Sequence, residues 1–173
     1  MWGFADGGKP TSELPTHLLN HQVGKRKSNG KIRIVYHLHP TNLIALTYIL
    51  PLEDEVFSRQ LFESSVECAV VFPEGLGVLP YDVPGCVDIG EKTSHKMEKY
   101  NAVVWSFHGL FVMGETFDST YGLADTIEKA ASILIKVLSV NPDYLHKKNT
   151  ISKDQLICLA DAFHVTINKD ILK

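Results

Sequence analysis

The segment that decides the fold spans residues 31–40 and reads KIRIVYHLHP. Its apolar side chains recur at every second position, which is the pattern of a half-buried β-strand. Alternate residues of a strand point to opposite faces, so Ile32, Ile34 and Tyr36 are expected to share one face. The pattern stops at His39-Pro40, because the residue before a proline avoids the helical region. We therefore predict a strand that ends at this dipeptide.

Further helices and strands are predicted on both sides of this strand. We expect helices over residues 11–28, 41–50, 54–63, 87–100, 120–139 and 151–164, and strands over residues 67–72, 78–81 and 102–113. An alternation of helices and strands is typical of an α/β fold built around one sheet, although periodicity does not give the order of the strands. The chain of 173 residues contains no internal repeat or linker. We therefore predict a single domain over residues 1–173.

The composition excludes several classes of protein. Hydrophobic residues make up 45% of the chain and charged residues 21%, which is ordinary for a globular protein. A net charge of -3 gives no electrostatic basis for nucleic-acid binding, and the apolar stretches are too short to span a membrane. The three cysteines, Cys68, Cys86 and Cys158, are odd in number and widely spaced. This spacing argues against a disulfide framework and favours a reducing, cytoplasmic setting.

Three histidines form a candidate metal site. His37 and His39 are two positions apart on a strand, so both imidazoles can point to one ion, with Zn–N distances near ~2.0–2.1 Å. The pair alone fits a polar strand face equally well. His108 lies within the apolar strand predicted over 102–113, where an imidazole needs a partner, and Gly109 beside it permits the close approach of a backbone or ligand. A lone histidine of this kind is more often a satisfied core residue, but the three together form the usual catalytic zinc set.

The predicted start of the first helix is a candidate anion site. Thr11 and Ser12 offer hydroxyl groups, and free backbone amides and the positive end of the helix dipole lie beside them. A phosphate bound there would lie near Glu13, which could then transfer a proton to or from an adjacent carbon. The alternative is an ordinary helix-capping motif, and the local sequence favours that interpretation.

Two other features have weaker signals. His17 and His21 are four residues apart on the predicted first helix and could also bind a metal, but the glutamate of the zinc-protease motif is absent between them. Glu67 precedes the short apolar strand predicted to end at residue 72. Its carboxylate is either a surface group at the end of that strand or a site residue, and the local sequence favours the surface.

Five short segments match, in order, the sequence motifs of one protein family. They are residues 10–15 (PTSELP), 37–48 (HLHPTNLIALTY), 59–61 (RQL), 70–73 (VVFP) and 107–109 (FHG). Together, and in this order over essentially the whole chain, they resemble the class II aldolase and adducin family. The block that begins at His37 is far more specific than a bare pair of histidines. The resemblance implies a class II aldolase-like α/β fold, in which helices flank a central, mainly antiparallel sheet.

The resemblance also implies a lyase that depends on Zn²⁺. The residues that it assigns are His37, His39 and His108 for the zinc, Glu13 as the catalytic acid/base, and Thr11 and Ser12 for the substrate phosphate. The implied substrate is a phosphorylated ketose, L-rhamnulose 1-phosphate. Its reversible cleavage would give dihydroxyacetone phosphate and L-lactaldehyde.

The family's assembly gives one more expectation. Its members form a ring of four subunits with active sites at the interfaces, which would make Glu67 a substrate-binding residue contributed across a subunit contact. Members also carry a sizeable segment before the Pro-Thr-Ser-Glu motif, and that segment completes the phosphate pocket. Only nine residues precede Pro10 here, so the chain resembles the C-terminal part of the family's domain.

Two alternatives to this function remain open from the sequence. The first is a related enzyme with the same zinc site, such as a fuculose-phosphate aldolase or a pentulose-phosphate epimerase. The second is an inactive interaction module like the adducin head domain, which shares the fold. The presence of Glu13 together with all three histidines favours an enzyme.

Overall fold

The computed structural model describes residue 5 and residues 7–173. The elements are α1 (Leu14–Lys27), β1 (Ile34–Leu38), α2 (Thr41–Leu46), α3 (Asp54–Phe62), α4 (Val66–Val71), β2 (Gly77–Leu79), α5 (Val87–Met97), β3 (Ala102–Trp105), β4 (Gly109–Gly114), α6 (Phe117–Val140), α7 (Lys153–Phe163) and the short 3₁₀ helix η1 (Lys169–Leu172). Within this part of the chain, no helix has the length and apolar character needed to cross a lipid bilayer.

One sheet of four strands in the order β1-β4-β3-β2 forms the centre of the fold. β4 pairs antiparallel with both β1 and β3, and β2 pairs parallel with β3. The expectation of a mainly antiparallel sheet is therefore confirmed, with the β2–β3 pair as the exception. In the β1–β4 register, His37 lies opposite Phe111 and Leu38 lies opposite Leu110. This pairing brings the end of β1 next to the start of β4.

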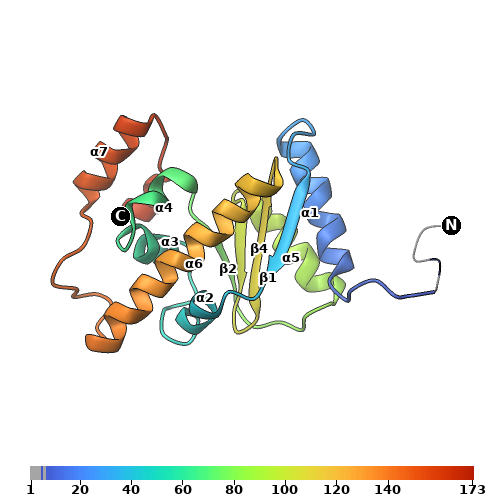
Figure 1. The fold of residues 1–173 in the computed structure, drawn as a ribbon, viewed down its shortest axis with the longest axis horizontal. Coiled ribbons are helices and arrows are strands. Elements are labelled where there is room, and N and C mark those ends of the chain that lie inside the picture. The colour runs from blue at the N-terminus through green and yellow to red at the C-terminus, as the bar shows by residue number, and fades with distance from the viewer. Residues whose placement is uncertain (1–4, 6) are drawn as a thin grey trace.

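Helices cover both faces of the sheet, which gives three layers (Figure 1). α1 and α5 lie on one face, and α2, α3 and α6 lie on the other. Alternate residues of each strand supply the two hydrophobic cores. The core under α1 and α5 contains Val103, Trp105, Phe111 and Met113, and the larger core contains Ala102, Val104, Leu110 and Val112. His37, opposite Phe111, therefore belongs to the α1 side of the sheet.

The longest helix, α6, buries one apolar stripe. Its first turn is fixed by a capping box, in which Thr116 and Ser119 exchange backbone and side-chain hydrogen bonds. The stripe faces the core: Leu123, Ile127, Ala130, Leu134 and Leu138 are all buried. Ile133 and Val137, which lie off the stripe, are exposed, as expected for a helix that packs on one side.

The strand predicted over residues 67–72 is wrong, because this segment forms the helix α4. Its valines suggested a strand, but its buried side chains have helical spacing. Cys68, Ala69 and Phe72 are fully buried, while Val71 is exposed. A strand would not bury the adjacent residues Cys68 and Ala69 in the same core. The Phe72 N–H also donates to the Cys68 carbonyl at 3.0 Å, which closes a helical turn.

The single strand predicted over residues 102–113 is also wrong. It is a hairpin in which β3 and β4 are joined by a tight turn over residues 106–108. The turn requires a positive φ of 66° at Phe107, and the His108 N–H donates to the Trp105 carbonyl at 3.1 Å. His108 therefore lies in a turn at the edge of the sheet and not inside a strand.

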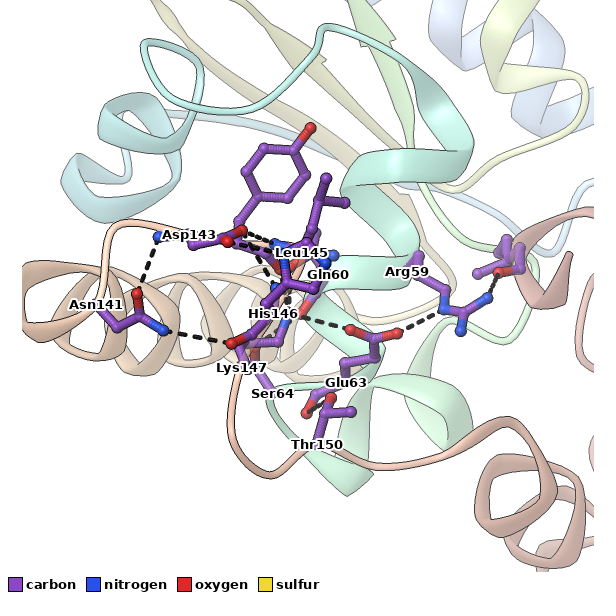
Figure 2. A network of polar contacts seen from close by, with 12 residues as sticks. Arg59, Gln60, Glu63, Ser64, Asn141, Asp143, Leu145, His146, Lys147 and Thr150 are labelled. Atoms are coloured by element: carbon purple, nitrogen blue, oxygen red, sulfur yellow. Dashed lines mark hydrogen bonds and ion pairs between the residues drawn. The ribbon is translucent and has the colours of Figure 1, made fainter.

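Polar contacts attach the segment after α6 to α3 (Figure 2). The Lys147 side chain is only 7% exposed, and its Nζ lies 3.1 Å from Glu63 Oε2 and 2.5 Å from Gln60 Oε1. Arg59 Nε donates to the other oxygen of Glu63 at 2.6 Å. Both oxygens of this largely buried carboxylate are thus paired, as burial of a charge requires. The network fixes residues 141–150 against the body of the fold.

Candidate metal centre

Three imidazoles converge at the edge of the sheet. His37 comes from β1, His39 follows the end of β1, and His108 comes from the β3–β4 turn. The Nε2 atom of His108 lies 3.1 Å from Nε2 of His37 and 3.3 Å from Nε2 of His39. Sequence spacing predicted the His37–His39 pair, and the fold brings in the third ring from 69 residues away.

The donor atoms fit a metal ion. Ligands at ~2.0–2.1 Å from a tetrahedral ion are themselves about 3.3 Å apart, close to the observed Nε2 separations of 3.1 and 3.3 Å. The Leu110 carbonyl lies 3.3 Å from Nδ1 of His37. This contact assigns the proton of His37 to Nδ1 and leaves the Nε2 lone pair free, as in many metal-binding histidines.

Electrostatics keep these rings in the form that binds metals. Burial, followed by the positive charges of His108 and His39, lowers the pKa of His37 to about 4. Burial and His39 also lower the pKa of His108. Near neutral pH both imidazoles are therefore neutral, and a neutral imidazole is the form that ligates a metal.

The unusual backbone of the β3–β4 turn is held by contacts of the two residues that precede His108. The Phe107 N–H donates to Thr47 Oγ1 at 3.1 Å, and the Phe107 ring lies 4.7 Å from the Tyr48 ring. Ser106 donates its hydroxyl to the Leu79 carbonyl at 2.6 Å. A positive φ is costly for a bulky residue such as Phe107. These contacts stabilise the conformation that points His108 toward the other two histidines.

Gly109 allows the two chain segments of the site to meet. A Cβ atom at this position would lie 2.4 Å from the Leu38 carbonyl oxygen, 3.0 Å from Cδ2 of His39 and 3.2 Å from Cε1 of His37. The close approach predicted for this glycine is therefore confirmed. Only a residue without a side chain lets β1 and both histidines lie this close to the turn.

We expect Gly109→Ala to push β1 away from the turn and to weaken both the fold and metal binding. Overpacking of this kind costs about 1–3 kcal/mol, and the obstructing atom is a backbone oxygen that cannot rotate away. Gly122→Ala on α6 is the matched control, because a Cβ there meets nothing within 4 Å. Urea unfolding and zinc titration of both variants provide the measurement. Equal stability and equal zinc affinity in the two variants would contradict the expectation.

Glu13 is the fourth group of the site. It immediately precedes α1, is only 7% exposed, and has an Oε2 atom without a hydrogen-bond partner among the described residues. Its carboxylate is near enough to His108 to raise the pKa of that ring against the effect of burial. The Glu13 side chain makes no capping hydrogen bond. The Glu13 carboxylate therefore takes no part in capping α1.

Thr11 and Ser12 lie beside Glu13 on the exposed surface. Thr11 Oγ1 accepts a hydrogen bond from the Glu13 N–H at 3.3 Å, so its hydroxyl partly caps α1. Ser12 packs against Gly85, where an added Cβ would lie 2.9 Å from the Ser12 Cβ. The two hydroxyls thus remain next to Glu13 and open to solvent, where an anion could reach them.

Other predicted candidates lie outside this cluster. Glu67 is exposed in the first turn of α4, and the contacts found for its carboxylate are a 2.5 Å hydrogen bond from Ser65 and an electrostatic interaction with Lys129. The structure therefore does not bring Glu67 to the three histidines of its own chain.

His17 and His21 do not join the three ligand histidines. His21 is exposed. The His17 ring lies 5.3 Å from the Phe111 ring, and its charge contributes to the lowered pKa of His37.

Sequence reasoning missed the aromatic wall behind His37. The Phe111 ring stacks on the His37 ring at a centroid distance of 4.2 Å, and Trp105 lies 5.6 Å from the same ring. These side chains shield the imidazole from water, which contributes to its lowered pKa. The sequence signal was limited to two aromatic residues in an apolar segment, and that pattern equally describes an ordinary core.

The family model and the curated relatives point to the same family. Residues 1–135 match the model of the Class II Aldolase and Adducin N-terminal domain. The chain is 50% identical over 166 residues to the rhamnulose-1-phosphate aldolase of Escherichia coli O81 (strain ED1a), covering 96% of this chain and 59% of that protein. It thus spans about three fifths of the length of this relative.

Solved structures agree in fold. A sugar-phosphate aldolase from Thermotoga maritima superposes with a TM-score of 0.69 at 35% identity, over 78% of this chain and 57% of that one. An L-fuculose-1-phosphate aldolase from Thermus thermophilus gives a TM-score of 0.61 at 19% identity, over 79% of this chain and 68% of that one. At 19% identity the second likeness concerns the fold alone.

The family model covers α1 to most of α6 and includes the three histidines and Glu13. The fold class expected from the sequence is likewise that of these structures. Residues 136–173, which contain α7 and η1, lie beyond the matched region. From the family model and the shared fold, we conclude that this chain belongs to the class II aldolase and adducin N-terminal domain family.

Proposed function

We propose that this chain carries the catalytic centre of a zinc-dependent sugar-phosphate aldolase. One observation supports this proposal above all: three Nε2 atoms converge, and the charge of the buried Glu13 carboxylate acts on one of their rings. One oxygen of that carboxylate has no partner among the described residues. A purely structural metal site would usually be closed by a fourth protein ligand. Three imidazoles with a carboxylate nearby suit an open, reactive site instead.

His37, His39 and His108 are the proposed metal ligands. When bound there, zinc would act as a Lewis acid that stabilises negative charge on substrate oxygens. An imidazole that ligates a metal carries no charge, so three such ligands would leave the full positive charge of the cation available. The Leu110 carbonyl orients His37 through Nδ1, and the Phe111 ring holds it flat from one side.

Glu13 is the proposed acid/base, with Thr11 and Ser12 as phosphate ligands. In the synthetic direction, the carboxylate of Glu13 would take a proton from the carbon next to the substrate carbonyl, and in cleavage it would return that proton. The hydroxyls of Thr11 and Ser12 would hold the phosphate at the start of α1, where free backbone N–H groups favour an anion. In this proposal the reacting carbon would lie between Glu13 and the histidines.

The substrate that we propose is L-rhamnulose 1-phosphate, cleaved to dihydroxyacetone phosphate and L-lactaldehyde. The proposal is supported by the 50% identity to an Escherichia coli rhamnulose-1-phosphate aldolase. The fold is shared with an L-fuculose-1-phosphate aldolase at only 19% identity. We place the reaction in the cytoplasm, where the free thiols of Cys68, Cys86 and Cys158 would remain reduced.

The test is to measure the metal content and the aldol cleavage of the purified chain. Because the chain matches 59% of its relative, both assays are repeated on the chain joined to the part of the Escherichia coli protein that it does not match. We expect about one zinc ion per chain, and faster cleavage of L-rhamnulose 1-phosphate than of L-fuculose 1-phosphate. No bound divalent metal and no cleavage in either protein would overturn the proposal.

Glu67 belongs to the proposed function as a residue of a neighbouring subunit in a ring of four. The support is its exposed position on α4, away from the histidines of its own chain, and the family resemblance. Exposed apolar side chains beside the site, Tyr48 at 71% and Phe107 at 41%, suit a subunit contact there.

We expect a mixture of two inactive variants to recover activity. Glu13→Gln and Glu67→Gln proteins each carry one defect, so a mixed ring would contain some sites with an intact Glu13 from one subunit and an intact Glu67 from the next. Dissociation, mixing and reassembly of the two variants, followed by the cleavage assay and light scattering, provide the measurement. If the mixture stays as inactive as its parts while forming tetramers, Glu67 does not act across the contact.

A further inference from the structure

The start of α2 is held by an acidic side chain from another helix. Glu128 of α6 accepts hydrogen bonds at Oε1 from the backbone N–H of Asn42 at 3.0 Å and from Asn42 Nδ2 at 2.7 Å. Its Oε2 accepts from the Leu43 N–H at 3.0 Å. The first N–H groups of a helix have no partner within the helix, and the helix dipole favours a negative charge there. Glu128 is thus the cap of α2, since Pro40 at the N-cap makes no side-chain cap bond.

This cap lies next to the least constrained of the three histidines. The β1–β4 register ends at Leu38, so sheet pairing does not fix the backbone of His39. His37, in contrast, is held by sheet pairing and by the Leu110 carbonyl. Among the described residues, no backbone group makes such a hydrogen bond to the His39 ring. The position of His39 therefore depends on the chain that follows it, which is Pro40 and then α2.

The path from Glu128 to His39 is short and stiff. Pro40 fixes its own φ at -69°, and α2 begins at the next residue. Leu38, His39, Pro40 and Glu128 line one hollow of about 220 Å³ together with Tyr121, Ala124 and Asp125. A displacement of the first turn of α2 would pass directly through Pro40 to the His39 backbone.

We propose that Glu128 is a positioning residue of the metal centre, which holds His39 at the distance from His108 that metal binding requires. The inference rests on the proposed function, in which His39 is a metal ligand. Glu128 itself does not touch the metal. It acts by fixing the start of α2, and its carboxylate supplies acceptors on both oxygens at once.

The test compares Glu128→Gln with Asp125→Asn. The glutamine keeps the volume of Glu128 but replaces one of its two acceptor oxygens with a donor that faces an N–H group. Asp125→Asn removes the same charge one turn away, where the carboxylate pairs with Lys129 at 3.7 Å. Zinc affinity is measured by competition with a chelator, and ligand geometry by the visible absorption spectrum of the cobalt-loaded protein. Circular dichroism establishes that each variant is folded.

We expect Glu128→Gln to bind zinc about 10-fold to 100-fold more weakly, as is usual when a partner behind a ligand is lost, and to show an altered cobalt spectrum. Asp125→Asn should match the wild type in both measurements. If Glu128→Gln keeps wild-type affinity and spectrum, or if Asp125→Asn loses as much, the proposal is overturned.

A second variant protects the test against misfolding. Asn42→Asp places a like charge against Glu128 and should displace it, while an acidic residue at the start of a helix favours the helix itself. The same loss of zinc affinity is expected from Asn42→Asp, and an unchanged affinity in this folded variant would count against Glu128 even if Glu128→Gln did not fold. If the wild type binds no metal, the proposed function fails as well. If the wild type binds zinc and the variants bind it equally well, only the role of Glu128 is contradicted.

Discussion

His108→Ala should remove the bound metal entirely. The Nε2 atom of His108 is within 3.1 and 3.3 Å of the corresponding atoms of His37 and His39, so this ring is the common neighbour of the other two. Two remaining imidazoles hold a divalent ion poorly, because protein zinc sites use at least three protein ligands. We expect the metal content to fall from about one ion per chain to none, and turnover to fall with it.

His95→Ala is the matched control, because His95 is exposed on α5. Metal content is measured by mass spectrometry after purification in excess zinc, and thermal unfolding is measured with and without added zinc. An ion that binds only the folded state adds about 2.7 kcal/mol of stability at 100 times its Kd. The wild type and His95→Ala should show this stabilisation, and His108→Ala should not. A His108→Ala protein that keeps a stoichiometric, stabilising ion would exclude the three-histidine site.

The element that sequence predicted best is α6, because its single apolar stripe directly reflects the face that packs. β1 was predicted as a strand, but the expectation that Ile32 and Tyr36 share one face is wrong. Ile32 precedes β1 and packs against the α1-side core, whereas Tyr36 packs against the larger core. α4 failed because a helix of six residues with several valines resembles a buried strand. Only the burial of Cys68 and Ala69 side by side distinguishes the two, and burial is a property of the folded chain.

The site was predictable in its ligands but not in their surroundings. The spacing of two residues on a strand indicated His37 and His39, and the His-Gly pair indicated His108. The turn that holds His108 was missed because aromatic and β-branched residues on both sides of Phe107 read as one continuous strand. Glu128 gave no signal at all, because its partner Asn42 is 86 residues away and the periodicity of a sequence does not reveal which helices meet. Long-range partners of this kind are set by the topology of the whole fold.

Glu13→Gln should keep the metal and lose turnover. Glutamine has nearly the same size as glutamate but cannot accept or return a proton, and general acid–base catalysis of this kind contributes about 10²-fold to 10⁴-fold to the rate. The three histidines are unchanged, so zinc content should remain at the wild-type value. Replacing a buried carboxylate that has an unpartnered oxygen among the described residues with a neutral amide should leave the melting temperature equal or higher. Reduced turnover at unchanged or increased stability is expected of a catalytic group.

The decisive readout is exchange of the dihydroxyacetone phosphate proton with deuterated water, because this reaction isolates proton transfer from carbon–carbon bond cleavage. Glu13→Gln should lose the exchange, while Glu91→Gln, an exposed acid on α5, should retain it. Loss of exchange with zinc still bound assigns proton transfer to Glu13. Loss of zinc from Glu13→Gln would instead make the carboxylate a ligand, and normal exchange would remove it from the mechanism. Since His108→Ala should lose metal and exchange together, only the pair of variants separates the group that moves the proton from the groups that hold the cation.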